Sequence, residues 1–475
     1  PWVSVTTYPA CEGASLVIVF TNSKYPLTNI QIKQGVITLI STSSTTTFSG
    51  FPASSLPVAK TTYVVADGQS NGTESVKFNN IEMPTNFCDG MDRQNGINFK
   101  YRNLQDTNTA IVTVNPGATS VDATISSTGD CLTWLAQVFS VYDGNLDTDG
   151  DALKDSWEVY GVGGINLPAL GANPYHKDIF VEVDWMAKSP TETQSHKPDP
   201  SVVTRAVSTF ANAPYANNPD GKAGINIHID ISNEVPHDDN LQPVWDEFDV
   251  IKAANFPAAR QDIYHYCLFA HMFEGGTWSG ISRGIPASDF IVSLGGWSTN
   301  PGTPDQQTGT FIHELGHNLG LRHGGNDDKN YKPNYLSIMN YFFQMSGVYR
   351  SGSWGHYDYQ RIAPYTLDET KLSEPAGIGD VSAGYGTKWY DPSHTERTTT
   401  VYKPIDWNWD GDSTDTGVSL DINYDGSKTT LGSQNNWQNI IYNGGSIGGI
   451  GFTAAQMTKP EDMPEELTYE EYIKI

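Results

Sequence analysis

The sequence predicts an N-terminal region of one or two all-β sandwich modules, followed by an α+β domain with a twisted mixed sheet and one central helix. Three observations predict this organisation. Residues 1–140 are rich in Thr, Ser, Val and Ile and lack helical periodicity, residues 177–294 alternate between strand and helix patterns, and a capped amphipathic helix begins at residue 303. Strands and helices that follow one another in this way build a layered α+β domain.

The N-terminal region contains short candidate strands separated by Gly, Pro, Asn and Asp clusters, which is typical of β-sandwiches. These strands are expected at residues 14–21, 35–41, 61–66, 97–101, 110–114 and 120–125. Nothing in residues 1–140 has a catalytic pattern. A plain accessory module is the simpler interpretation, and contact with a glycan or a cell surface is the functional alternative.

The α+β region is expected to begin with a strand at residues 177–185, where charged and apolar side chains alternate. A helix is expected at residues 200–215, because Val202, Ala206 and Phe210 recur at helical spacing. Further strands are expected at residues 225–231, 262–273 and 290–294. The Gly-rich stretch 275–284 then lies at the edge of the sheet or is an ordinary surface loop.

The central helix is marked at both ends. Thr303 and Gln306 form a capping box, with Pro304 at the first helical position, so a helix begins there. Gly320 ends it, because glycine adopts a left-handed conformation without steric cost. The residues expected to pack on the core are Phe311, Ile312, Leu315 and Leu319.

A metal site is predicted on the other face of this helix. His313 and His317 lie four residues apart, so both imidazoles project from one face with Glu314 beside them. The chain reversal at Gly320 brings His323 back as a third nitrogen ligand. Three protein ligands and a fourth position open to water are the pattern of a catalytic zinc site. A helix with two surface histidines is the alternative, which the third histidine disfavours.

Residues 313–323, HELGHNLGLRH, resemble the zinc signature of the metzincin metallopeptidases, and residues 337–341, SIMNY, resemble their methionine turn. The resemblance implies a metzincin-like fold, zinc bound by His313, His317 and His323, Glu314 as general base, and Met339 packed beneath the metal. It also implies that Tyr341 lies near the metal, and that an edge strand pairs with the substrate. Gly324, after the third histidine, fits no subfamily well, so the subfamily stays open.

An acidic loop at residues 147–158 predicts a calcium site. Carboxylates recur at positions 1, 3, 5, 9 and 12 of an EF-hand-like loop, with a backbone carbonyl at position 7. The expected ligands are Asp147, Asp149, Asp151, the Leu153 carbonyl, Asp155 and Glu158. Ala152 stands where EF-hands have glycine, so a thrombospondin-like calcium turn is an alternative.

A second acidic segment contains a short repeat, DxNxDG, whose two copies begin fifteen residues apart. Both resemble the first half of a calcium loop. The possible ligands are Asp406, Asn408, Asp410, Asp412, Asp421, Asn423 and Asp425. Neither copy has an acidic residue at its twelfth position, so other groups must complete each shell. The acidic tail from residue 461 is expected to form a short helix or to fray.

These patterns divide the chain into four parts: β modules at 1–140, a calcium-binding linker at 141–160, the metzincin-like protease domain at 161–400, and a C-terminal segment at 401–475. The balance of 28 Lys and Arg against 54 Asp and Glu gives a net charge of −26. Such a surface repels phosphate backbones and anionic lipid, which makes nucleic acid and membrane surfaces poor hypotheses for partners. No apolar run is long enough to span a membrane.

The chain begins with Pro1, so we expect a processed and exported form. Its four cysteines, Cys11, Cys88, Cys131 and Cys267, lack metal-ligand spacing, and the sequence does not choose among their disulfide pairings. His228, His265 and His271 lie in or near strand patterns and are expected to be structural.

The predicted function is that of a secreted zinc-dependent endopeptidase with structural calcium, acting on proteins or peptides. Glu314 takes a proton from the attacking water and passes it to the leaving amine, and Tyr341 donates a hydrogen bond to the oxyanion. One alternative is a protease restricted to glycoproteins, which the N-terminal modules would recognise by their sugars. Another is a calcium-dependent adhesive or surface protein with an inactive protease fold.

Overall fold

The computed structural model describes residues 16–20 and 28–475, except residues 52, 54–57, 67–73, 85–86, 89–105, 116, 130, 143, 215, 363–365, 380–383 and 450–464. The chain forms two compact units. The first contains residues 1–148, 154–162 and 166–174, and the second contains residues 149–153, 163–165 and 175–475.

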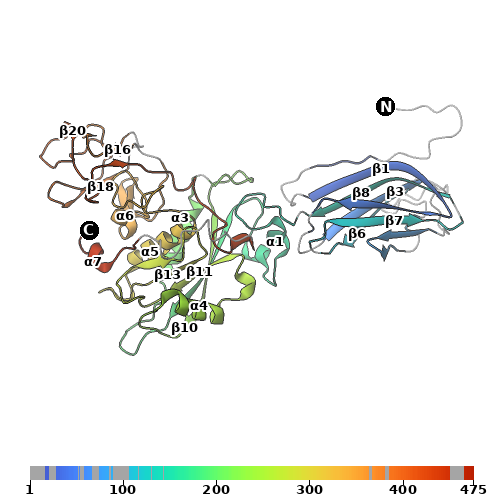
Figure 1. Ribbon diagram of the computed structural model, residues 1–475, viewed down its shortest axis with the longest axis horizontal. Coiled ribbons are helices and arrows are strands. Elements are labelled where there is room, and N and C mark those ends of the chain that lie inside the picture. Colours follow the sequence, from blue (N-terminus) through green and yellow to red (C-terminus); the bar gives the residue numbers. More distant parts are fainter. Residues whose placement is uncertain are drawn as a thin grey trace. The chain divides into compact units, whose positions relative to one another are not determined.

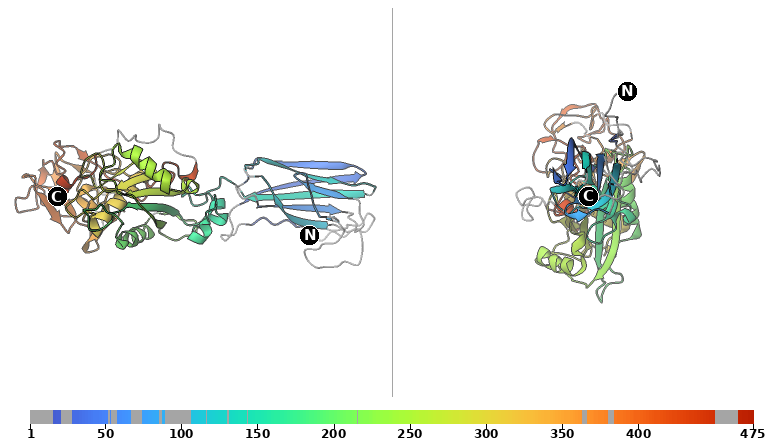
Figure 2. Two further views of the ribbon diagram at one scale, coloured as in Figure 1. Left: turned by 90° about the horizontal axis from the view of Figure 1, so that it is seen from below. Right: turned by 90° about the vertical axis from the view of Figure 1, so that its right-hand side faces the viewer.

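The first unit contains two four-stranded antiparallel sheets around a common apolar core (Figures 1 and 2). One sheet has the order β1-β8-β3-β6 (Thr28–Ile40, Cys131–Tyr142, Val58–Ala66, Asp106–Thr113), and the other has the order β2-β7-β4-β5 (Ser43–Ser49, Ser120–Ser126, Ser75–Phe78, Ile81–Glu82). The ring of Phe139 on β8 lies 5.2 Å from Phe48 on β2 and 5.5 Å from Phe78 on β4. Helices α1 (Asp155–Tyr160) and α2 (Leu167–Leu170) complete the unit.

Four of the strands expected here overlap β1, β3, β6 and β7. The strand expected at residues 97–101 lies outside the described residues. The strand expected at residues 14–21 is wrong for its described part, because residues 16–20 form no strand and their side chains are exposed. The apolar run was not sufficient evidence for a strand, because no described strand pairs with residues 16–20.

The second unit is built on a five-stranded sheet with the order β10-β9-β11-β13-β12 (Asn226–Val235, Asp178–Met186, Tyr264–Phe269, Asp289–Val292, Gly280–Ser282). The first four strands are parallel, and β12 pairs antiparallel with β13 at the edge. β12 falls within the Gly-rich stretch for which an edge position was one of two expectations. β9 is buried along its whole length, as a strand in the interior of a parallel sheet is expected to be.

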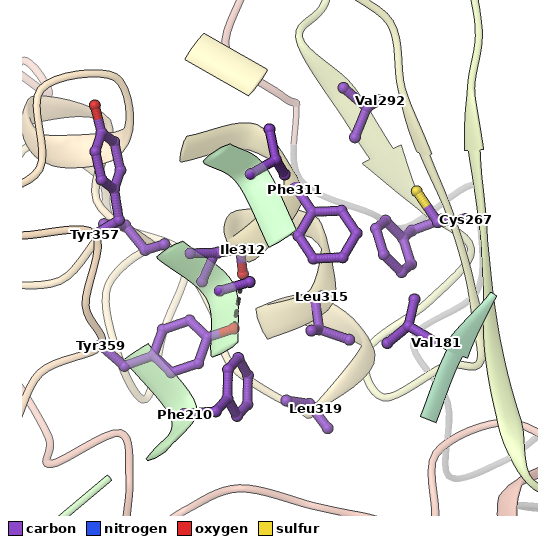
Figure 3. Packing of buried hydrophobic residues seen from close by; sticks show 14 of the residues in the cluster. Val181, Phe210, Cys267, Val292, Phe311, Ile312, Leu315, Leu319, Tyr357 and Tyr359 are labelled. Atoms are coloured by element: carbon purple, nitrogen blue, oxygen red, sulfur yellow. Dashed lines mark hydrogen bonds between the residues drawn. The ribbon is translucent and has the colours of Figure 1, made fainter. Parts of the chain in front are cut away.

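Helix α5 (Pro304–Asn318) packs against this sheet and against α3 (Pro200–Ala211). Figure 3 shows the four predicted apolar side chains in contact with the core: Phe311 and Leu315 lie beside Cys267 and Val181 of the sheet, and Ile312 and Leu319 lie near Phe210 and Tyr359. The Tyr359 hydroxyl donates to the Ile312 carbonyl oxygen at 2.7 Å. The helix is buried on every side from Gln306 to Asn318.

The rest of the second unit consists of short elements, which include helix α4 (Val244–Asn255), helix α6 (Tyr341–Gln344) and helix α7 (Tyr469–Tyr472). Along the sequence, the described residues between α6 and α7 form four two-stranded sheets. These are β14–β15 (Val348–Arg350, Ser353–His356), β18–β19 (Thr387–Tyr390, Glu396–Thr399), β16–β21 (Leu367–Asp368, Thr430–Leu431) and β17–β20 (Leu372–Ser373, Thr416–Val418). The last two sheets join residues on either side of position 400 around one apolar core.

Candidate functional site

Helix α5 places the first two predicted metal ligands. Its capping box is present as expected, with the Thr303 hydroxyl accepting from Gln306 and the Gln306 side chain accepting from Thr303. The helix ends before Gly320, whose φ of 86° is the left-handed conformation predicted for that position. The Leu321 amide then donates to the Gly316 carbonyl oxygen at 2.9 Å, so the chain turns back toward the helix.

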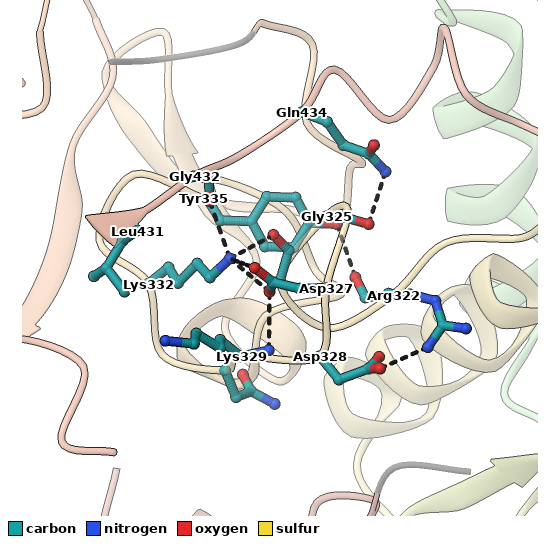
Figure 4. A network of polar contacts seen from close by, with 12 residues as sticks. Arg322, Gly325, Asp327, Asp328, Lys329, Lys332, Tyr335, Leu431, Gly432 and Gln434 are labelled. Atoms are coloured by element: carbon teal, nitrogen blue, oxygen red, sulfur yellow. Dashed lines mark hydrogen bonds and ion pairs between the residues drawn. The ribbon is translucent and has the colours of Figure 1, made fainter. Parts of the chain in front are cut away.

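The turn that follows places His323, and a buried lysine holds this turn (Figure 4). The Lys332 ammonium donates to Asp327 at 2.6 and 2.8 Å and to the carbonyl oxygens of Gly324 and Gly432, each at 3.0 Å. A Cβ at position 324 would lie 2.0 Å from an Asp327 oxygen. The same Cβ would lie 2.5 Å from the Lys329 carbonyl oxygen, so the close approach of this backbone atom requires glycine at position 324.

The three histidines converge. The Nε2 atoms of His313, His317 and His323 are 3.1 to 3.2 Å from one another. Four ligand atoms bound tetrahedrally to zinc are about 3.3 Å apart, given zinc–nitrogen distances near 2.05 Å, so the arrangement fits zinc. His313 and His317 direct Nδ1 to the carbonyl oxygens of Ile338 and Leu321, each at 2.8 Å.

Those two contacts place the proton of each ring on Nδ1 and leave Nε2 free to bind a metal. Burial lowers the pKa of His313 and His317, which keeps both rings neutral, as metal binding requires.

The segment expected to be a methionine turn lies directly beside the histidines. The Met339 sulfur lies so close to the helix that a Cβ at position 316 would be 2.4 Å from it, so Gly316 makes room for the side chain. The Tyr341 ring centroid is 4.7 Å from that of His323 and 5.8 Å from that of His313. The predicted residues are thus brought together around the three histidines.

Glu314 is fully buried, and neither of its carboxylate oxygens has a hydrogen-bond partner among the described residues. It faces the edge strand, where a Cβ at Gly280 would lie 2.7 Å from Oε1. Burial raises the pKa of Glu314 well above its ordinary value, and the negative charge of Glu466 adds to this effect. A carboxylate whose pKa is raised in this way has the basicity that a general base needs.

The fourth position was expected to be open to water, and this expectation is wrong for the structure. Glu466, from the tail of the chain, directs its carboxylate to the three histidines: Oε2 lies 3.3 Å from His313 Nε2 and 3.4 Å from His323 Nε2, and Oε1 lies 3.4 Å from His317 Nε2. Burial alone would raise the pKa of Glu466, but the histidines lower it well below its ordinary value. The three rings and this carboxylate form a closed four-donor set.

The tail continues from Glu466 along the edge of the sheet. The Ser279 amide donates to the Leu467 carbonyl oxygen at 2.8 Å, and the Tyr469 amide donates to the Thr277 carbonyl oxygen at 3.0 Å. Trp278 and Thr468 form an antiparallel bridge. Residues 467–469 thus extend the sheet as an added antiparallel segment.

Side chains hold the tail in place as well. The Tyr341 hydroxyl donates to the Glu465 carbonyl oxygen at 2.5 Å. Leu467 is fully buried, and the ring of Tyr472 stacks on Trp297 with centroids 5.0 Å apart. The tail was expected to fray or to form a short helix. It does form helix α7, but the contact of Glu466 with the histidines was not foreseen, because no local pattern marks it.

The first predicted calcium loop is divided between the two units. In the second unit, Asp151 is buried and accepts from the Leu153 and Asp178 amides, each at 2.7 Å. In the first unit, Asp155 accepts from the Thr148 amide and hydroxyl at 2.7 and 2.6 Å. Both of these hydrogen bonds lie within the first unit. Asp147 and Glu158 belong to the first unit, and Asp149 belongs to the second.

The two DxNxDG copies have the same local structure. Asp406 accepts from the Asp410 and Gly411 amides, and Asp421 accepts from the Asp425 and Gly426 amides. A fully buried glutamate packs on each loop: Glu374 accepts from Trp407 and Asp415, and Glu369 accepts from Ile422 and Thr429.

Among the described residues, no group of three His, Cys, Asp or Glu ligand atoms includes a member of either copy. Asn408 and Asn423 each donate to the aspartate two residues later in the repeat, and Asp412 accepts from Thr414.

The remaining histidines are in part structural, as predicted. His228 contacts Asp178 at 2.5 Å, and His265 contacts Asn318 at 2.9 Å. His271 is different, because it lies with Glu192, His196 and His237 in a second group of possible metal ligands. The sequence signals for this group are weak: Glu192 and His196 are four residues apart, but the other two members are distant.

Residues 282–359, which include the three histidines and Tyr341, match the Peptidase M66 family. The chain is accordingly a metallopeptidase by its sequence. No curated protein matches it significantly. Among solved structures, dimeric latent PorU from Porphyromonas gingivalis aligns with 13% identity and a TM-score of 0.19, covering 26% of this chain and 14% of the PorU chain. Among the described residues, no helix is both long and apolar enough to cross a membrane.

Proposed function

We propose that this metallopeptidase is a secreted zinc-dependent endopeptidase of metzincin-like fold, in which Glu314 is the general base. The observation that carries the proposal is the convergence of three histidine Nε2 atoms, which lie 3.1 to 3.2 Å from one another. Beside them is the buried carboxylate of Glu314, which has no hydrogen-bond partner among the described residues. Imidazole nitrogens at this spacing suit zinc.

His313, His317 and His323 would hold a zinc ion, which would supply the Lewis acidity needed to activate water near neutral pH and to polarise a peptide carbonyl. Glu314 takes the proton of the attacking water and then transfers it to the leaving amine, because its buried carboxylate has no hydrogen-bond partner among the described residues and follows His313 on the same helix. The Tyr341 hydroxyl, beside the histidine rings, donates a hydrogen bond to the oxygen on which negative charge develops. Gly280 leaves the space that the Glu314 carboxylate occupies.

We further propose that calcium binds to the acidic loop at residues 147–158 and has a structural role. The support is the spacing of its carboxylates, which is that of a calcium loop, together with the burial of Asp149, Asp151 and Glu158. The repeats at Asp406 and Asp421 are weaker candidates, because their first aspartates already accept backbone amides.

The test is elemental analysis together with cleavage of a peptide library, performed on the wild type and on Glu314→Gln, each also carrying Glu466→Ala so that the carboxylate does not cover the histidines. The matched control is Glu465→Gln, an adjacent and exposed glutamate. We expect Glu314→Gln to retain zinc and to lose about 1,000-fold in kcat. Full activity of that variant, or the absence of peptide cleavage in every form, would contradict the proposed function.

A further inference from the structure

A second group of possible metal-binding side chains lies at the carboxyl ends of the parallel strands in the second unit. Glu192 and His196 follow strand β9, His237 follows β10, and His271 follows β11. These three strands are parallel neighbours, so their carboxyl ends lie side by side at the same end of the sheet. Ligand sites in sheets of this kind form outside the carboxyl ends of the strands.

The geometry resembles that of the first histidine group. Glu192 Oε1 lies 3.0 Å from His271 Nδ1 and 3.3 Å from His196 Nε2, and the two nitrogens are 3.3 Å apart. His237 Nδ1 lies 3.6 Å from Glu192 Oε2. The three ring centroids are separated by 5.1, 5.1 and 5.6 Å, against 4.8, 4.8 and 5.2 Å for the first group. Tetrahedral zinc ligands are about 3.3 Å apart.

Surrounding groups fix these donors. Asn300 donates to Glu192 Oε1 and the Ser189 amide donates to Oε2, both at 2.7 Å. His237 Nε2 lies 2.9 Å from an oxygen of Asp239, the carboxylate support that metal-bound histidines commonly have. His237 Nδ1 also lies 2.9 Å from the Ala187 carbonyl oxygen, so the tautomer protonated at Nδ1 competes with metal binding by this ring.

The backbone makes room for the group. A Cβ at Gly295 would lie 2.3 Å from His271 Nδ1, so only glycine allows that ring to face Glu192. The side chain of His196 is 2% exposed and that of Glu192 is 9% exposed. A carboxylate and three imidazoles are therefore held together largely out of water, in a place where a cation would bind favourably.

We propose that Glu192, His196, His237 and His271 bind a second transition-metal ion, for which zinc is the best match to three imidazoles and one carboxylate. The four protein donors fill a tetrahedral shell, so the ion is structural. It joins the loops that follow three neighbouring strands and thereby stabilises the sheet on which the α5 helix packs.

The test is elemental analysis of the full-length protein after dialysis against zinc-free buffer, with circular dichroism to verify the fold. We expect the wild type to hold two zinc ions per chain. His271→Ala, and independently the more conservative Glu192→Gln, reduce the content to one or weaken zinc retention about tenfold or more in a chelator titration. His317→Ala loses the other ion and retains this one.

His356→Ala is the matched control, because His356 lies outside both groups and its Nε2 is 3.2 Å from the Ser353 hydroxyl. It is expected to keep two ions. A wild type with a single zinc ion, all of which is lost in His317→Ala, would overturn the proposal. An unchanged content of two ions in both His271→Ala and Glu192→Gln would do the same.

A separate observation concerns the tail and rests on the proposed function. Glu466 approaches all three histidines of the first group, and residues 467–469 pair with residues 277–279 at the edge of the sheet. An extended peptide that binds a protein by strand addition makes backbone contacts of this kind. The same tail therefore covers both the metal position and a strand edge that a peptide substrate needs.

We infer that residues 465–472 are an intramolecular inhibitor, which excludes both water and substrate until the tail is displaced. The Glu466 carboxylate takes the fourth ligand position, and the Glu465 carbonyl oxygen takes the hydrogen bond that Tyr341 otherwise offers to substrate. Leu467, Tyr469 and Tyr472 anchor the segment through burial and through ring contacts with Trp297.

The experiment compares full-length wild type, Glu466→Ala and the neighbouring control Glu465→Ala, each loaded with cobalt in place of zinc. Exchange of a carboxylate ligand for water changes the visible absorption of cobalt, so this readout does not depend on activity. We expect Glu466→Ala to change the spectrum, to bind a small hydroxamate about tenfold more tightly, and to cleave peptides about tenfold faster in its zinc form. Glu465→Ala is expected to behave as the wild type does.

The outcomes separate this inference from the proposed function. A changed spectrum and tighter hydroxamate binding without peptide cleavage in any form would support the inhibitory tail and contradict the endopeptidase. Equal cleavage, equal spectra and equal hydroxamate binding in wild type and Glu466→Ala would overturn the inhibitory tail and leave the endopeptidase standing.

Discussion

The backbone carbonyl oxygen of Gln344 occupies the space beside Gly309 where a side chain would begin. A Cβ built at position 309 lies 1.9 Å from that oxygen, so helices α5 and α6 can approach this closely only with glycine there. Because α5 carries His313 and α6 begins at Tyr341, this contact sets the separation between the metal ligands and the tyrosine.

Gly309→Ala should therefore destabilise the protein and disturb the site together. The obstacle is a backbone atom, so the helix must shift, and we expect a loss of about 3 kcal/mol in the free energy of unfolding. Denaturant unfolding measures it. Gly432→Ala is the control, since its Cβ would meet only one atom, at 4.0 Å, and it should cost less than about 1 kcal/mol. Equal losses in the two variants would contradict the account.

Lys332→Met should weaken zinc binding through His323. Its ammonium is fully buried and joins Asp327 to two backbone carbonyls, and burial lowers its pKa. Methionine fills similar space but removes the donor that joins Asp327 to the two carbonyl oxygens, so we expect about tenfold weaker zinc affinity in a chelator competition. Lys329→Met, three residues earlier in the chain and on a partly exposed side chain, should leave the affinity unchanged.

Tyr341→Phe should lower kcat about 100-fold with little change in KM, because the hydroxyl is proposed to act on charge that develops only during the reaction. The hydroxyl also binds the Glu465 carbonyl oxygen, so the kinetics belong in the Glu466→Ala background. A rise in KM with kcat unchanged would assign Tyr341 to substrate binding instead.

Asp151→Asn should abolish the response of thermal stability to calcium. If calcium binds the loop at residues 147–158, saturating calcium raises the Tm of the wild type by about 5 °C, and chelation reverses this. Asp246→Asn, at an exposed position in the first turn of α4, should keep the full calcium response. If the Tm of the wild type does not change with calcium, the proposed calcium site at residues 147–158 is wrong.

The elements that sequence patterns predicted well are those with local signals. The start of α5 at Thr303, its end before Gly320, and its apolar face follow from capping chemistry and helical spacing. Strand β9 was expected at residues 177–185 and lies at Asp178–Met186. Helix α4 was not predicted, because its sequence combines exposed charges with only a weak apolar face, a pattern that is also typical of loops.

The features that could not be predicted are those in which distant segments meet. Glu466 contacts the histidines although it is more than 140 positions away in the sequence. No repeat or residue spacing in the acidic tail predicts such a contact. The group of Glu192, His196, His237 and His271 depends on three parallel strands ending at the same edge, which becomes visible only once their order in the sheet is known.

The Lys332 ammonium has a further consequence for the order of events during folding. It binds carbonyl oxygens at positions 324 and 432, which are separated by more than 100 residues, and closing so long a loop is slow compared with forming a helix. Helix α5 can present its two histidines early, whereas the third ligand gains its position only after residue 432 has docked. Metal capture should therefore conclude the folding of this unit and not nucleate it.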